Sequence, residues 1–450
     1  MNANLDILYQ AVENQKDLIL AAERYIWNNP ESGYREWKTH AYMKEKFEEF
    51  GYTVVEAGNI PGFYADIDTG IPGPKVGIFA ELDSLIVPTH PEADPVTGAV
   101  HACAHNCQCA AMLGIAAAFK APGGLDNLCG SIRLLVVPAE ELIEIGYRKQ
   151  LKKDGIIRYF GGKQEFLYRG YLEGVDLSMM VHTSSSKGLG CGIGSNGCVT
   201  KIATFKGKGA HAGGAPEKGI NALYAANAGL TAANALRETF KDDDHIRFHP
   251  IITMGGDAVN AIPDKVVVES YVRGATTESI IESNEKVNRA FAGAAAAMGC
   301  TITFDDAHGY APRKNDLTMR EIFAEIGADF FPAEELKMGN AWGTGCSDMG
   351  DINCVMPSIH PHIAGCKGPS HSSEFYIEDP YTACVVSAKV QAGVTARILE
   401  NGGAKAKEIL EKAGTFPSVN EYLQTIDKLC FEGEGVRYNE DGTVTLTYHN

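Results

Sequence analysis

The chain has 450 residues, 45% hydrophobic and 22% charged, which is enough for a large buried core and for two domains. Its 57 acidic and 40 basic residues give a net charge of −17 without any basic cluster, so we expect no nucleic-acid partner. The N-terminal residues lack the pattern of a signal peptide, and no apolar run approaches the roughly 20 residues that span a bilayer, which predicts a cytoplasmic protein with no membrane partner.

The first part of the chain has an α/β pattern. Apolar residues follow a helical spacing over residues 5–50, with a break at Asn29-Pro30, and a strand signal follows at residues 51–55. Three later apolar runs are predicted strands, and each ends in side chains that bind metals or transfer protons. They are residues 76–80 before Glu81 and Asp83, residues 132–137 before Glu140 and Glu141, and residues 177–181 before His182. Because open α/β sheets bind ligands beyond the carboxyl ends of their strands, we expect one shared polar site there.

The pattern changes in the middle of the chain. The order strand, helix, strand, strand, helix, strand predicts a ferredoxin-like module that is inserted into the first domain. Its predicted elements are residues 199–205, 217–236, 250–254, 265–272, 278–298 and 301–304. Residues 317–399 return to longer helices, and a boundary is predicted near Asn401-Gly402-Gly403, before a last helix and a strand at residues 444–448.

These elements predict an α/β fold with a central, mostly parallel sheet and helices on both faces, together with an inserted ferredoxin-like α+β domain. The predicted boundaries place the first domain in residues 1–197 and 309–402, the inserted domain in residues 198–308, and a C-terminal extension in residues 403–450.

The densest cluster of chemically active residues runs from His101 to Asn106, just before an alanine-rich segment that is predicted to be helical. The 12 cysteines of the chain are expected to be free thiols, and most of them small buried residues. Cys103 is different, because the start of a helix favours the thiolate that a metal ion binds. We therefore favour Cys103 and His105 as metal ligands over two small buried polar residues.

Two adjacent glutamates, Glu140 and Glu141, follow a predicted buried strand. Such a pair is usually a solvated loop, but at this position one carboxylate can bind a metal while the other handles protons. His182 ends a predicted strand and His371 lies in a glycine-bounded loop, which makes both of them candidate ligands. His360 and His362 are rival candidates, interpreted as structural or supporting residues because Pro361 fixes a turn between them.

Several motifs occur in an order that is typical of one family. They are Glu81–Asp83, His101–Asn106, Pro138–Glu141, Gly209–Pro216 and Asn260–Asp264. Between about Tyr25 and Leu399 the chain resembles the aminoacylase and carboxypeptidase-G family of metallopeptidases. The resemblance is to the amidohydrolase branch, with its aminobenzoyl-glutamate hydrolases and cytosolic dipeptidases.

The resemblance implies a metal-dependent amidohydrolase or peptidase with two divalent ions, zinc or manganese. It would cleave the amide bond of an N-acyl amino acid, an aminobenzoyl-glutamate-like compound or a dipeptide. The implied ligands are Cys103, His105, Glu141, His182 and His371. Glu140 would be the general base and Asp83 would support a ligand. The inserted domain would be a lid and the surface of a homodimer, with His211 and Asn260 reaching the substrate in their own or the partner subunit's site.

The sequence departs from the family near Cys103. Ala104 replaces a glycine, and it would be strained if the backbone there has a positive φ. Asn106 and Gln108 replace an aspartate and a histidine of much of the branch, although Asn106 matches the aminobenzoyl-glutamate hydrolases and dipeptidases. Two other readings therefore stay open: a binding or scaffold protein on the same fold, and a hydrolase that uses Cys103 as nucleophile with His105.

Overall fold

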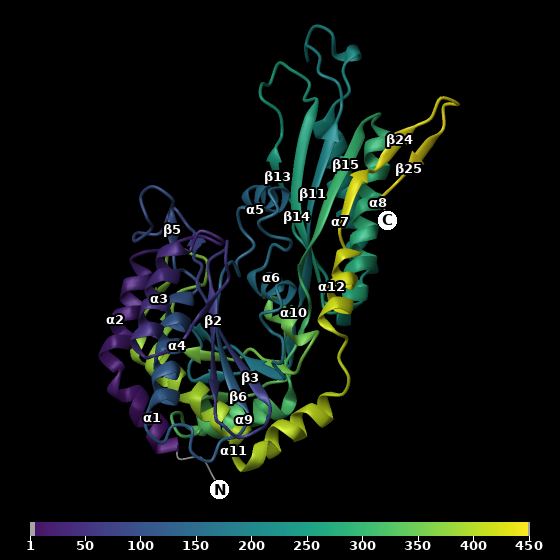
Figure 1. The fold of residues 1–450 in the computed structure, drawn as a ribbon. Coiled ribbons are helices and arrows are strands. Elements are labelled where there is room, and N and C mark those ends of the chain that lie inside the picture. The colour runs from purple at the N-terminus through teal and green to yellow at the C-terminus, as the bar shows by residue number, and fades with distance from the viewer. Residues whose placement is uncertain (1–4, 449–450) are drawn as a thin grey trace. The chain divides into compact units, whose positions relative to one another are not determined.

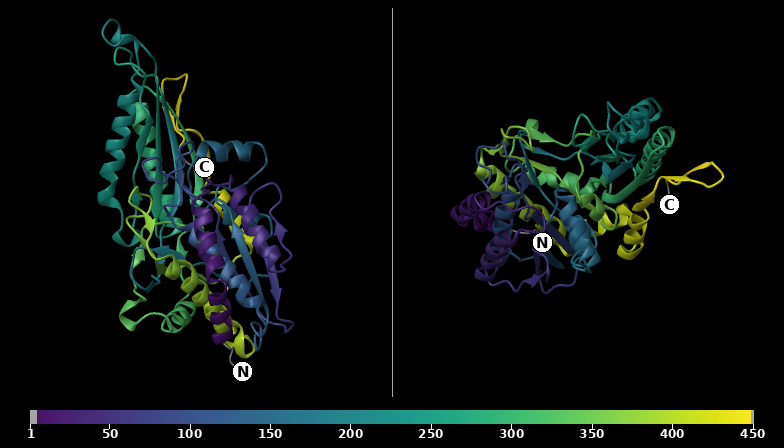
Figure 2. Two further views of the ribbon diagram at one scale, coloured as in Figure 1. Left: turned by 90° about the vertical axis from the view of Figure 1, so that its left-hand side faces the viewer. Right: turned by 90° about the horizontal axis from the view of Figure 1, so that it is seen from above.

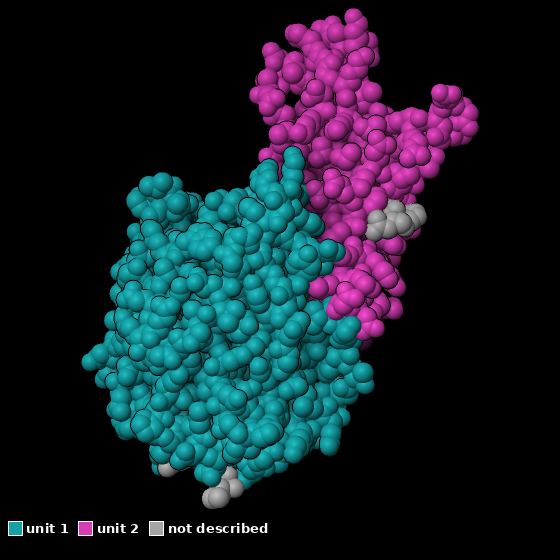
Figure 3. Space-filling model, viewed as in Figure 1, with its two compact units in different colours: residues 1–194, 314–342, 347–419 teal, residues 195–313, 343–346, 420–450 magenta. Residues whose placement is uncertain are grey.

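The computed structural model describes residues 5–448, and the chain forms two compact units (Figures 1 and 3). Unit 1 contains residues 1–194, 314–342 and 347–419, and unit 2 contains residues 195–313, 343–346 and 420–450. Each unit has its own hydrophobic core.

A six-stranded sheet lies in unit 1, in the order β1-β2-β6-β3-β7-β19. The four strands from β6 to β19 run parallel, whereas β1 and β2 are antiparallel, so the predicted mostly parallel sheet is confirmed. The strands are β1 (Val55–Glu56), β2 (Phe63–Asp68), β6 (Ser131–Val137), β3 (Lys75–Glu81), β7 (Leu177–Met179) and β19 (Ser358–Ile359).

Helix α4 (His105–Lys120) is the central helix of unit 1. Every residue from His105 to Phe119 is buried, which fits its alanine-rich sequence, apolar on all sides. It packs against α1 (Leu5–Asn14), α2 (Lys16–Trp27) and α11 (Ser387–Ala413). This packing holds the start of α4, and with it Cys103 and His105, in a fixed position.

The strand ends bring the predicted site residues together. Glu81 at the end of β3 lies opposite Val137 at the end of β6, so the Glu81–Asp83 and Pro138–Glu141 segments begin at the same level. One prediction was wrong here: β7 ends at Met179 and does not reach residue 181. His182 begins a separate short strand, β8 (His182–Ser184), which pairs with β20 (His362–Ala364) because the chain turns into a second sheet.

Unit 2 has an antiparallel sheet in the order β12-β14-β11-β15-β23, with β13 also paired to β14. Its strands are β12 (Arg247–Phe248), β13 (Ile251–Met254), β14 (Lys265–Gly274), β11 (Gly197–Lys206), β15 (Thr301–Tyr310) and β23 (Phe431–Glu434). Helices α7 (Ala222–Ala235) and α8 (Thr277–Ala297) lie side by side against this sheet (Figures 1 and 2). The order of elements is the predicted split one. Helix α7 begins at Ala222 rather than at residue 217, because the Asn221 side chain accepts hydrogen bonds from the N–H groups of Leu223 and Tyr224 and caps it.

The C-terminal part passes from one unit to the other. The predicted boundary near residue 402 falls inside α11, where Asn401, Gly402 and Gly403 have positive φ values of 52°, 68° and 71°. The helix resumes and ends at Ala413, and α12 (Val419–Asp427) leads to β23, which joins the sheet of unit 2 beside β15. A last hairpin consists of β24 (Val436–Tyr438) and β25 (Val444–Leu446).

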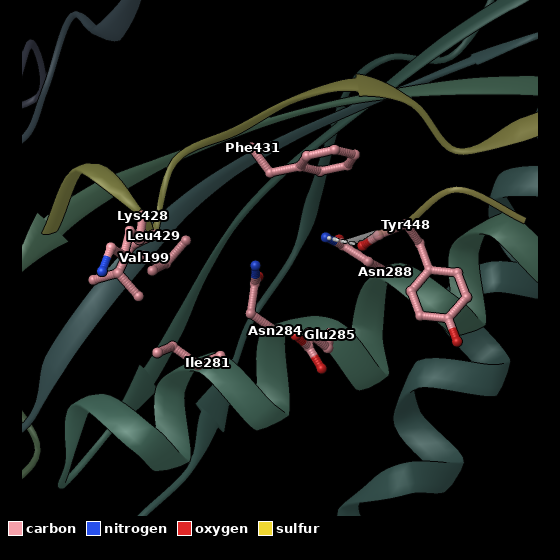
Figure 4. Close-up of a pocket in the computed structure, with 9 residues that line it drawn as sticks. All are labelled: Val199, Ile281, Asn284, Glu285, Asn288, Lys428, Leu429, Phe431 and Tyr448. Carbon is pink, nitrogen blue, oxygen red and sulfur yellow. Dashed lines mark hydrogen bonds between the residues drawn. The ribbon is translucent and has the colours of Figure 1, made fainter. Parts of the chain in front are cut away.

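A buried polar network lies between the sheet of unit 2 and α8, next to a cavity of about 90 Å³ (Figure 4). The Lys201 ammonium donates to Asp306 Oδ1 at 2.6 Å, and the amides of Asn284 and Asn288 each donate to Asp306 Oδ2 at 2.8 Å. Asn288 also donates to the carbonyl of Tyr448 at 3.3 Å. The charges of Lys201 and Asp306 therefore neutralise each other, and the neighbouring amides complete the hydrogen bonds of the carboxylate.

Candidate metal centre

The backbone at the start of α4 is in the conformation that favours glycine. Ala104 has φ 64° and ψ 23°, a left-handed conformation that costs a residue with a Cβ roughly 1–2 kcal/mol. Ala139, just before Glu140, is left-handed as well, with φ 56°. Its N–H donates to Glu36 Oε1 at 2.8 Å, which helps to hold that turn. A left-handed residue thus lies between Cys103 and His105, and another lies directly before Glu140 and Glu141.

Asp83 fixes the orientation of the His105 ring. Its Nδ1 lies 2.9 Å from the Asp83 carbonyl oxygen and 3.1 Å from Asp83 Oδ1, so Nδ1 is the donor to both. The other ring nitrogen, Nε2, is buried without a hydrogen bond and lies 3.1 Å from Glu81 Oε2. This position favours a positive charge: burial opposes it, but Glu81 raises the pKa of His105 well above its usual value.

His182 is oriented in the same way. Its Nδ1 donates to the carbonyl oxygen of Thr183 at 2.7 Å, which leaves Nε2 facing Cys103 Sγ at 3.3 Å. Burial and the nearby His105 lower the pKa of His182 to about 4, so the ring is neutral and Nε2 is available as a ligand. His360 and His362 stack on each other beside His182, with ring centroids 5.6 Å apart.

Glu141 and His371 contact each other at the edge of the site. His371 Nε2 lies 3.2 Å from Glu141 Oε1, and the His371 N–H donates to the carbonyl of Ala102 at 3.0 Å. The N–H of Glu141 donates to Asp83 Oδ2 at 2.8 Å, so Asp83 contacts both His105 and Glu141. The His371 side chain is about half exposed, which makes this the open edge of an otherwise buried cluster.

Within residues 5–448, three groups of side chains could each hold a metal ion, because the ligand atoms inside each group lie within 4.8 Å of one another. The groups are Cys103, His105 and His182; Cys103, Glu141 and His371; and Glu81, His105 and Glu140. The first two share the Cys103 thiol and together contain the five predicted ligands. A thiol, three imidazoles and a carboxylate are donors that fit zinc, and the imidazoles and carboxylate also fit manganese.

The surroundings shift the pKa values of the two adjacent glutamates in opposite directions. Burial, and then the charges of Glu81 and Glu141, raise the pKa of Glu140 well above its usual value. Burial acts in the same direction on Glu141, but the contact with His371 outweighs it and lowers the pKa of that carboxyl. Burial and the Glu141 charge also raise the pKa of the Cys103 thiol. A nearby cation would reverse that effect, because a thiol that binds a metal ion gives up its proton.

Several residues of the site were missed by sequence reasoning. Lys163, in α6 (Gly162–Tyr168), contacts Glu81 and Asp348, and all three side chains are fully buried. Lone Lys and Asp residues far apart in the chain give no signal of such a contact. Gln108 was noted only as a departure from the family, yet its Nε2 donates to Glu81 Oε2 at 2.8 Å. Asn106, the other departure, donates from its Nδ2 to Glu23 Oε1 at 2.9 Å.

His211 and Asn260 lie together on exposed loops of unit 2. The N–H of Ala212 donates to the carbonyl of Asn260 at 2.9 Å, and His211 forms a β-bridge with Ala261. His211 Nδ1 accepts hydrogen bonds from the N–H groups of Gly213 and Gly214, at 3.2 and 2.9 Å. The ring proton therefore sits on Nε2, which is a donor.

None of the helices in the described part of the chain has both the length and the apolar character to cross a membrane.

Comparisons with known proteins agree with the motifs. Residues 193–298 match the family model described as a peptidase dimerisation domain. The chain is 27% identical over 386 residues to the Xaa-Arg dipeptidase of Mus musculus, covering 81% of each chain. It is 29% identical over 267 residues to the N-acetyl-L-cysteine deacetylase of Bacillus subtilis, covering 57% of this chain and 59% of the relative.

The fold has a solved counterpart. A dinuclear metal binding peptidase from the M20 family of Bacillus subtilis matches with a TM-score of 0.64 and 21% identity, covering 86% of this chain and 99% of that one. The resemblance read from the motifs, the fold class and the expectation of a hydrolase are confirmed. Residues 193–298 thus match a peptidase dimerisation domain, and the chain is similar over most of its length to a dipeptidase in sequence and to an M20 peptidase in fold.

Proposed function

We propose that the chain is a hydrolase that uses two divalent metal ions to cleave the amide bond of a dipeptide or an N-acyl amino acid. The observation that carries the proposal is the convergence of five ligand side chains in two groups that share Cys103. Asp83 and the carbonyl of Thr183 orient His105 and His182 so that each Nε2 faces the cluster, which is how metal-ligating histidines are held.

Cys103, His105, Glu141, His182 and His371 are the proposed ligands, and zinc and manganese are the proposed ions. The soft thiolate favours zinc, whereas imidazole and carboxylate ligands also suit manganese. Elemental analysis of protein purified without added metal distinguishes the two.

The substrate class is supported by the names of the relatives. One relative is a dipeptidase and another is a deacetylase of an N-acetyl amino acid, and both names describe an amide next to an amino acid. An aminobenzoyl-glutamate-like compound belongs to the same chemical class. A panel of N-acyl amino acids and dipeptides, assayed with added zinc or manganese, tests the assignment.

Two ions held by these five side chains would supply Lewis-acid chemistry and would activate a water molecule as the nucleophile. Glu140 is the proposed general base, because its carboxyl lies beside His105 but belongs to neither of the two groups that share Cys103. The same carboxyl then delivers the proton that it accepted to the leaving amine. Asp83 fixes the ring of His105 and the backbone of Glu141, and so holds both ligands in place.

Unit 2 is the proposed lid and the surface of a homodimer, which the matched dimerisation domain supports. His211 presents its Nε2 proton from an exposed loop, as a donor for the oxyanion that develops on the amide carbonyl. Asn260 lies next to it in the neighbouring loop and is proposed to contact the substrate.

The two alternatives have less support. The cysteine hydrolase would use Cys103 as nucleophile with His105. Cys103 Sγ lies 3.3 Å from His182 Nε2, and burial and Glu141 oppose the thiolate that a nucleophile needs. A scaffold protein without metals was suggested by Ala104, yet the backbone adopts the left-handed conformation despite the Cβ, and the ligand groups are complete.

The substitution Glu140→Gln tests the proposed function. It removes the proton acceptor and leaves the five ligands, so we expect turnover to fall by about 10²–10⁴-fold while the metal content stays unchanged. Initial rates and elemental analysis measure the two quantities. Glu45→Gln is the control, because Glu45 is an exposed residue of α3 (Trp37–Glu49). Full activity of the Glu140 variant would remove this residue from the mechanism.

A further inference from the structure

Lys163 is a buried cation at the edge of the candidate metal centre. Its ammonium contacts Glu81 Oε1 and Asp348 Oδ1, and its backbone N–H donates to Asp348 Oδ2 at 3.0 Å. The three side chains are fully buried, so the contacts are screened from water. Charge-assisted contacts of this kind are strong, and a buried charge without a partner is costly.

The position of Lys163 is tied to the loop that carries Glu140 and Glu141. The preceding residue, Gly162, donates its N–H to the carbonyl of Ala139 at 3.2 Å. A Cβ on Gly162 would lie 1.7 Å from the carbonyl oxygen of Pro138, so the start of α6 is pressed against this loop. Lys163 is therefore held at one place relative to the general base and the ligands.

Glu81 has both carboxylate oxygens engaged. Oε1 contacts the ammonium of Lys163, and Oε2 accepts a hydrogen bond from Gln108 Nε2 at 2.8 Å. The Glu81 N–H also donates to Gln108 Oε1 at 3.1 Å, so the amide side chain clamps this residue from two directions. Glu81 nevertheless belongs to a third group of potential ligands, with His105 and Glu140. A metal ion in that group would share the Glu81 carboxylate with an ammonium of the same sign of charge.

We propose that Lys163 is a built-in counter-ion that keeps Glu81 in an ion pair and so keeps the third group free of metal. The inference rests on the proposed function, because it concerns which of the three groups bind ions. Lys163 is thus a positioning residue: it limits the centre to the two groups that share Cys103, and it neutralises carboxylates that would otherwise require another cation.

The number of ions bound per chain tests this role. Each protein is dialysed to equilibrium against Mn²⁺ or Zn²⁺, and bound metal is measured by elemental analysis. We expect two ions for the wild type and for Lys163→Arg, which keeps the positive charge. We expect a third ion for Lys163→Met, because Glu81 and Asp348 are then buried carboxylates without a cation. Two ions in Lys163→Met would overturn the proposal.

Glu81→Gln provides an arm that does not depend on the folding of the Lys163 variants. Lys163 keeps Asp348 as a partner in this variant, and we expect it to bind two ions, whereas Glu141→Gln should lose one. Loss of an ion from Glu81→Gln would make Glu81 a ligand and overturn the inference while leaving the proposed function intact. A wild type that binds no ion would overturn both. Lys201→Met, which removes a buried lysine of unit 2, is the matched control and should bind two ions.

Discussion

The two units each bury a lysine, but the surroundings of the two ammonium groups differ in charge. Lys201 in unit 2 has one carboxylate, Asp306, and two amides that complete its network, so the charges cancel. Lys163 in unit 1 has two carboxylate partners, Glu81 and Asp348. A third carboxyl, that of Glu140, is near enough to raise the pKa of the Lys163 ammonium as well. A buried network with equal positive and negative charge can stabilise a fold without other ions. An excess of buried carboxylates requires further cations to neutralise it. The comparison therefore distinguishes a structural lysine from one at the candidate metal centre.

Lys201→Met breaks the balanced network and has the largest expected effect on stability. It leaves Asp306 buried without a cation, so the free energy of unfolding of unit 2 should fall by about 3–5 kcal/mol. Chemical denaturation, monitored by hydrogen exchange of peptides from each unit, measures this change in the free energy of unfolding. Lys206→Met, at an exposed position of the same strand, is the control. A similar loss in both variants would show that the network does not stabilise the unit.

Removal of metal with a chelator tests the comparison in unit 1. Ions present at 100 to 1,000 times their dissociation constant stabilise the state that binds them by roughly 3–4 kcal/mol. We expect this loss of stability in unit 1, which contains the proposed ligands, and no change in the stability of unit 2. Hydrogen exchange with and without chelator measures both. Stability of unit 1 that is insensitive to the chelator would favour the scaffold alternative.

Asn284→Ala removes one amide from the balanced network without changing its charge. Asn284 lies on the helix that lines the cavity (Figure 4). Its amide donates a hydrogen bond to the Asp306 carboxylate, so we expect the free energy of unfolding of unit 2 to fall by about 1.5–3 kcal/mol. The measurement is the midpoint of urea unfolding. Asn227→Ala, at an exposed position of α7, should change the midpoint little. Equal midpoints for both variants would contradict a stabilising role of the amide.

Ala104→Gly has the smallest expected effect, and its sign is opposite. Glycine adopts the left-handed conformation without the Cβ penalty but loses more backbone entropy on folding, so a net gain of about 0.5–1 kcal/mol is expected in unit 1. Thermal unfolding with metal present measures it. Ala110→Gly, inside α4, should instead destabilise the unit. A loss in Ala104→Gly would mean that the Cβ makes contacts worth more than the strain.

Much of the site could be predicted because its residues lie in short motifs. The Cys103–His105 pair precedes a recognisable helix, and Glu140 and Glu141 follow a recognisable strand. The structure brings these motifs together with His182 and His371 in the groups expected for metal ligands. The end of β7 was predicted wrongly, because an apolar run does not reveal where the chain leaves one sheet and enters another.

The sequence by itself determined the elements and the chemistry at their ends, since apolar periodicity and helix or strand signals depend on residues that are close along the chain. Only the tertiary structure decided which distant side chains share one buried space. Lys163, Glu81 and Asp348 meet because α6 is pressed against the loop after β6, and no local pattern records this contact. Long-range ion pairs depend on how elements pack, and packing is a property of the whole fold.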